Sequence, residues 1–213
     1  MTKVEHMDYQ IDPKFLGSSD KPKQVAYAIW DLISIWAVII AAVALHMYML
    51  SRQVVDLPSW SKPLIAVVTL VVIASRQHAL LSLVHEAAHR HFLPGKWNDR
   101  ISDLLCAFPL LVVTRFYRHY HLLHHRHVNT ADDPDWSRKA WDFPKASLPI
   151  LVRFVGGEAF SSIGRRLKLF AKGLFEHRIY SFVLLLEVLC AFLVGWQNYM
   201  LFWACPMFFL LPI

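Results

Sequence analysis

Long apolar stretches alternate with polar segments along the chain, and their lengths predict membrane-spanning helices. Residues 32–51 contain no Asp, Glu, Lys or Arg, and as a helix these twenty residues cover a hydrocarbon core of roughly 30 Å. Residues 63–85 carry only Arg76 as a charge, and residues 179–213 carry only Glu187. Because soluble helices of this length normally show a polar face, the pattern predicts two transmembrane hairpins, the second one beginning near residue 179.

Two shorter segments between the hairpins have the pattern of helices at the membrane surface. Residues 104–114 are uncharged and contain Pro109, and they are too few to span the bilayer. They predict a re-entrant or interfacial helix that begins at Asn98 as its N-cap. Farther along, apolar residues recur at helical spacing among basic ones, at Phe160, Ile163, Leu167, Phe170 and Leu174. These predict a helix in the headgroup plane, with a soluble amphipathic helix as the alternative.

Charge placement predicts how the chain is oriented in the membrane. Of the 22 Lys and Arg residues, fifteen lie between Arg90 and Arg178, and four lie before residue 25. By the positive-inside rule we expect a cytosolic N-terminal tail over residues 1–24 and a cytosolic segment over residues 90–178. Anionic lipid headgroups account for the net charge of +6, so no nucleic-acid partner is expected.

Eight of the twelve histidines lie in two short clusters beside apolar segments. The clusters consist of His85, His89 and His91, followed by His119, His121, His124, His125 and His127. Histidine is a mediocre helix former and is costly to leave unpaired near hydrocarbon, so packing alone does not explain this crowding. A shared metal ion does explain it.

Helical spacing identifies which histidines can share a metal ion. His85 and His89 are four residues apart, and His121, His124 and His125 follow the spacing i, i+3, i+4. On helices, each set lies on one face. We therefore predict these five as metal ligands, more than the three or four that zinc usually takes. The remaining histidines have an ordinary hydrogen-bonded or exposed role as their simplest explanation.

Three aspartates follow the second cluster, at positions 132, 133 and 135, around Pro134. The composition predicts a turn. As a second interpretation, the carboxylates of Asp132, Asp133 and Asp135 orient the ligand imidazoles by hydrogen bonds.

The sequence HEAAH, residues 85–89, also matches the zinc metalloprotease signature H-E-x-x-H, in which Glu86 is the general base. A membrane zinc protease is therefore an alternative. The second histidine cluster, for which such a protease has no use, argues against it.

Together the two clusters resemble the first two histidine boxes of the membrane-bound fatty acid desaturase superfamily. The H-x-x-x-H box corresponds to His85–His89 and the R-x-x-H-x-x-H-H box to Arg118–His125. The resemblance covers about residues 25–213, and it implies an all-α integral membrane protein in which two transmembrane hairpins flank a cytosolic histidine-box segment with interfacial helices.

In that superfamily, histidines ligate two non-haem irons that activate O₂ and remove hydrogens from an acyl chain. The resemblance therefore implies iron, O₂, an acyl-lipid, acyl-CoA or acyl-carrier substrate, and an electron donor such as ferredoxin or cytochrome b5. Acyl or alkane hydroxylases and carotenoid hydroxylases or ketolases share the scaffold and stay open as alternatives. The resemblance also implies a third box after the second hairpin, so we expect the chain to be an N-terminal fragment whose desaturase-like domain, residues 25–213, is incomplete. The expected activity then belongs to the intact protein, and the fragment by itself is expected to be inactive.

Overall fold

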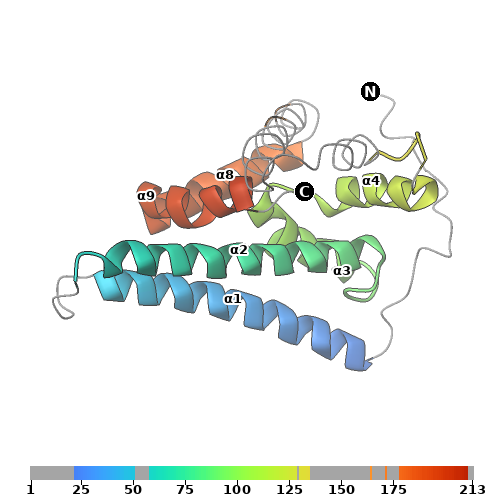
Figure 1. The fold of residues 1–213 in the computed structure, drawn as a ribbon. Coiled ribbons are helices and arrows are strands. Elements are labelled where there is room, and N and C mark those ends of the chain that lie inside the picture. Colours follow the sequence, from blue (N-terminus) through green and yellow to red (C-terminus); the bar gives the residue numbers. More distant parts are fainter. Residues whose placement is uncertain are drawn as a thin grey trace.

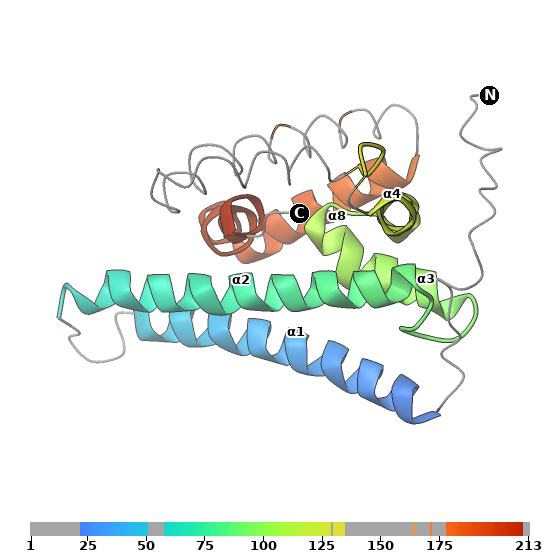
Figure 2. The same ribbon diagram turned by 45° about the vertical axis from the view of Figure 1, so that its right-hand side comes forward.

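The computed structural model describes residues 22–50, 58–128, 130–134, 164, 171 and 178–210, and all the regular elements within these ranges are helical. Helix α1 (Pro22–Leu50) and helix α2 (Ser61–Ala88) run antiparallel, side by side (Figures 1 and 2). Both are long and apolar enough to cross a membrane. The predicted all-α membrane architecture is confirmed, and its first hairpin is this pair.

Burial and exposure divide the surface of this hairpin in a way that suits a bilayer. Leu32, Ile35 and Ile39 of α1 pack against Leu80 and Leu83 of α2, at the spacing of one helix face. The outward faces are apolar as well, and they expose large side chains such as Trp30, Ile40, Val68 and Val71. Since apolar surface of this extent is unfavourable in water, lipid is its natural surrounding.

The segment after α2 folds back over the hairpin. Helix α3 (Trp97–Ser102) continues as a π-helix, η2 (Asp103–Ala107), and a 3₁₀-helix, η3 (Phe108–Leu110). The indole of Trp36 on α1 donates a 2.9 Å hydrogen bond to the carbonyl of Leu105. An indole hydrogen bond from Trp203 to the carbonyl of Pro109, 2.8 Å long, ties the other side of this segment to the C-terminal helices.

Both ends of this helix differ from the sequence prediction. The helix begins at Trp97, before Asn98, and ends at Leu110, because Leu111 takes a left-handed conformation with φ 55°. Asn98 does not cap it. Its amide is buried and hydrogen-bonds the backbone of Leu93 and Ala87, so its role is to hold the chain reversal after α2.

The second histidine cluster lies on helix α4 (Thr114–His127). Helix α8 (Arg178–Val194) is followed by α9 (Trp196–Tyr199) and two π-helices, η5 (Met200–Ala204) and η6 (Pro206–Leu210). The helical axis bends by 118° at Gly195, between α8 and the helices that follow it. These helices therefore form a broken span or a re-entrant loop, at the place of the predicted second hairpin. The predicted surface helix over residues 160–174 lies almost entirely outside the described residues.

Candidate metal centre

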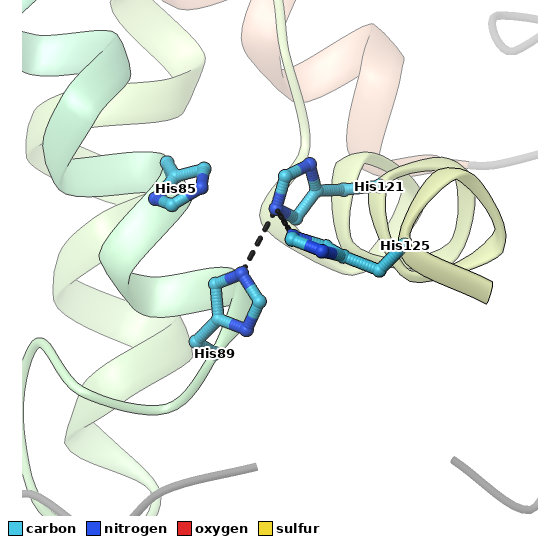
Figure 3. Close-up of side chains that lie close together, drawn as sticks. All are labelled: His85, His89, His121 and His125. Carbon is cyan, nitrogen blue, oxygen red and sulfur yellow. Dashed lines mark hydrogen bonds between the residues drawn. The ribbon is translucent and has the colours of Figure 1, made fainter. Parts of the chain in front are cut away.

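Four histidines from the two clusters converge beside the end of α2. His85 and His89 come from α2 and the residue after it, and His121 and His125 come from α4. Their candidate ligand atoms all lie within 4.8 Å of one another (Figure 3). Spacing of i and i+4 on each side produces this arrangement, because it stacks two imidazoles on one helix face.

The chain leaves the helical path directly after His89. Ala88 is the last residue of α2, and His89 follows it as the C-cap, with its amide donating a 3.3 Å hydrogen bond to the carbonyl of His85. Arg90 then takes a left-handed conformation, with φ 62°. This reversal ends α2 at the cluster, so that α4 can reach the same place.

The contacts among the rings suit ligands of one metal ion better than side chains that hydrogen-bond one another. Nε2 of His121 lies 2.9 Å from Nε2 of His89 and 2.9 Å from Nε2 of His125 (Figure 3). A neutral imidazole nitrogen carries one proton or one lone pair, so His121 Nε2 cannot make both contacts as good hydrogen bonds. A central cation accepts a lone pair from every ring, and nitrogens bound at about 2.1 Å from one ion lie about 3 Å apart. The donor set therefore fits a metal ion.

The electrostatics of the cluster keep the rings of His121 and His125 neutral. Burial, followed by repulsion from the neighbouring imidazoles, lowers the pKa of His121 from 6.5 to about 3. Burial and the nearby rings also lower the pKa of His125. Neutral imidazoles are the form that binds metals, so these two donors are available at neutral pH without loss of a proton.

His124, the fifth predicted ligand, lies at the edge of this group. Its ring centre is 5.8 Å from that of His125 and 6.4 Å from that of His121. Its Nδ1–H donates a 2.8 Å hydrogen bond to the carboxylate of Asp133, whose side chain is buried. The bond fixes the tautomer with the proton on Nδ1, as a carboxylate does for a metal-binding histidine. Whether His124 binds metal stays a prediction.

The three aspartates lie in different environments. Asp133 contacts a predicted ligand directly, whereas Asp132 is exposed in the turn and Asp135 lies outside the described residues. The predicted turn is present, since the amide of Thr130 bonds the carbonyl of His127 and the amide of Asp133 bonds the carbonyl of Thr130.

Arg118 joins the two histidine-bearing helices, a role that the sequence analysis did not assign. The buried guanidinium of this α4 residue donates to the carbonyl of Ala88 at 2.9 Å and to that of Ala87 at 2.8 Å. It also forms a two-pronged ion pair with Asp99 of α3. Carbonyls at the end of a helix lack partners within the helix, so Arg118 caps α2 at its ligand-bearing end. We call Arg118, Asp99 and these two carbonyls the arginine clamp.

Asp99 is charged in this clamp. Burial acts to raise the pKa of its carboxyl, but hydrogen bonds from Arg118 and Asn98 and the charges of Arg118 and Arg90 outweigh it and hold the pKa below 3.8. The position of Arg118, three residues before His121 in the second box, was the available sequence signal.

Glu86 contacts two imidazoles. His85 Nδ1 lies 3.3 Å from its carboxylate and His91 Nδ1 lies 3.7 Å from it, at about half exposure. A carboxylate at Nδ1 leaves the other ring nitrogen of His85 for a metal. In the H-E-x-x-H interpretation this glutamate is a base acting on water, whereas here it contacts a candidate ligand.

Comparison with known proteins gives a family match for most of the chain. Residues 58–213 match the fatty acid desaturase family, a range that begins just before α2 and includes both histidine boxes and α8. No curated protein and no solved structure matches significantly. The match indicates an oxidoreductase-type enzyme of the desaturase and hydroxylase kind, and the two apolar helices agree with a membrane location. The chain belongs to the fatty acid desaturase family.

Proposed function

We propose that the protein is an O₂-dependent oxidoreductase that introduces a double bond into the acyl chain of a fatty acid or lipid at a non-haem di-iron centre. The observation that carries this proposal is the convergence of His85, His89, His121 and His125, two from each box, at one point. Iron use in the desaturase family supports the choice of metal.

The donor set and the surrounding residues fit this role. The four converging imidazoles hold metal, and His124, oriented by Asp133, is the fifth proposed ligand. When bound, iron supplies the capacity to activate O₂ for removal of hydrogen from an unactivated methylene. The arginine clamp keeps α4 at a fixed distance from the end of α2, so the two pairs of imidazoles stay preorganised. The neighbouring apolar helices bound the space for an acyl chain.

Substrate and electron donor follow from the same proposal. The substrate is an acyl-lipid, acyl-CoA or acyl-carrier thioester, and reducing equivalents come from a carrier such as ferredoxin or cytochrome b5. We place the histidine boxes on the cytosolic side, where the basic residues between Arg90 and Arg178 predict them and where such carriers are available.

The experiment supplies purified full-length protein with ferrous iron, a reducing system, O₂ and a defined phospholipid, and measures products by mass spectrometry. We expect loss of two hydrogens from the acyl chain. Gain of one oxygen atom assigns the protein to the hydroxylases on the same scaffold. Zinc dependence with peptide cleavage that Glu86→Gln abolishes would establish the protease alternative.

A further inference from the structure

A polar groove lies on the transmembrane hairpin, between α1 and α2. Its volume is about 610 Å³, which is in the range of roughly 300–1,000 Å³ typical of small-molecule sites. Its polar lining consists of Asp31, Ser34, Ser75, Arg76, His78 and Ser82. Ionisable side chains within membrane-spanning helices are costly and mark binding sites by default.

Arg76 and Asp31 bring opposite charges to this groove without pairing. The guanidinium of Arg76 hydrogen-bonds the hydroxyl of Ser75 at 3.1–3.2 Å, and no carboxylate in the described ranges forms an ion pair with it. Asp31 directly precedes the uncharged run 32–51, which places it at the boundary of the hydrocarbon core. A guanidinium matches a phosphate and a carboxylate matches an ammonium, so the groove is complementary to a zwitterion.

The exposed face of α2 changes character at the groove. Leu64, Val68 and Val71 are 53%, 54% and 58% exposed, and Ser75, His78 and Ser82 continue the same stripe at alternating intervals of four and three residues. The stripe is apolar on the side away from the histidine boxes and polar from Ser75 onward. The apolar part of the stripe matches the acyl tail of a lipid, and the polar part matches its headgroup.

We propose that this groove binds a phospholipid with a phosphoethanolamine headgroup, drawn from the leaflet on the side of the histidine boxes. The phosphate lies on Arg76 and the ammonium lies on Asp31. The acyl chains follow the exposed apolar stripe of α2 toward the opposite leaflet.

Such a lipid is a bound structural component, separate from the proposed reaction. Arg76 lies nine residues before His85, which is about 13 Å along the axis of α2. The tails run away from the histidines. The inference therefore stands or falls independently of the desaturase activity.

The test measures binding of phosphatidylethanolamine and phosphatidylglycerol to the purified protein by native mass spectrometry. Phosphatidylglycerol has the same phosphate without the ammonium, so the wild type should prefer phosphatidylethanolamine. Arg76→Gln should weaken binding of both lipids about tenfold, the size expected for loss of one charged hydrogen-bonding group. Asp31→Asn should weaken phosphatidylethanolamine alone and remove the preference.

Lys62→Gln is the matched control, because Lys62 is an exposed base on the same helix outside the groove. It should bind both lipids like the wild type. The proposal is overturned if Arg76→Gln and Lys62→Gln bind lipid equally, or if the wild type shows no preference. If Arg76→Gln fails to fold, the Asp31→Asn variant is used instead, because Asp31 is exposed. An unchanged preference of Asp31→Asn for phosphatidylethanolamine over phosphatidylglycerol then contradicts the proposal.

Discussion

Arg118 illustrates how one side chain connects the two histidine boxes. It is buried among the carbonyls of Ala87 and Ala88 and the carboxylate of Asp99, and thereby joins the end of α2, α3 and α4. Lysine is a poor replacement, since one ammonium cannot reproduce the planar fork. The clamp stabilises the fold and also fixes the separation of the metal-binding rings.

Replacing Arg118 by Ala should therefore lower both stability and metal affinity. We expect a loss of about 2–3 kcal/mol in the free energy of unfolding, below the range for fully buried pairs because Asp99 is partly exposed. Thermal unfolding in detergent and Co²⁺ titration followed by absorption measure the two effects. Arg115→Ala, an exposed arginine one turn earlier on α4, is the control and should change neither. Equal behaviour of the two variants contradicts the clamp.

The pH dependence of the clamp follows from the lowered pKa of Asp99. A carboxyl with a folded pKa below its unfolded value of 3.8 contributes stability that is complete above pH 3.8 and declines as the pH falls through the folded pKa. The difference in unfolding temperature between wild type and Asp99→Asn should hold constant from pH 7 to about pH 5 and shrink only below 3.8. A difference that disappears near pH 6 would assign the stabilisation to another group.

At the scale of the secondary-structure elements, the positions at which helices end or bend determine where the candidate metal centre and the C-terminal helices lie. Arg90, after the end of α2, and Leu111, after η3, both take a left-handed backbone conformation. Gly195 separates α8 from α9 with φ 84° and ψ 132°. Non-glycine residues rarely adopt this last conformation. The 118° bend lies at this residue.

Gly195→Ala should strain this bend. A Cβ at Gly195 meets only the Asn198 amide at 3.7 Å, so the expected cost of about 1–3 kcal/mol comes from the backbone conformation and not from a clash. Thermal unfolding measures it. Gly164, which has no positive φ and open space around its Cβ position, supplies the control Gly164→Ala. If both variants unfold at the same temperature, the bend does not require glycine.

At the scale of the whole molecule, the periodicity of the sequence predicted which helices form better than it predicted where they end and what they contact. Two spans and the convergence of His85, His89, His121 and His125 followed from charge-free length and helical spacing. The arginine clamp did not, because an arginine in a polar segment is usually exposed, and its burial depends on α3 folding back beside α2. The end of α2 at Ala88 also depends on tertiary contacts, such as those of Asn98 with Ala87.

Orientation in the membrane is testable by cysteine labelling. In a variant without Cys106, Cys190 and Cys205, a cysteine at exposed Lys96, near the histidines, should react with an impermeant thiol reagent only after the cells are opened. A cysteine at exposed Ser59, in the turn before α2, should react from outside. The reverse pattern would separate the histidine boxes from cytosolic electron donors.

The metal content of the purified protein tests the central claim most directly. Full-length wild-type protein should contain iron with little zinc. His121→Ala should lose the iron, because its ring contacts the imidazoles of both His89 and His125. His127→Ala, on the same helix but outside the converging four, should retain it. Stoichiometric zinc in the wild type, or iron that is unchanged in His121→Ala, would contradict the assignment of this cluster as the iron centre of a desaturase-family enzyme.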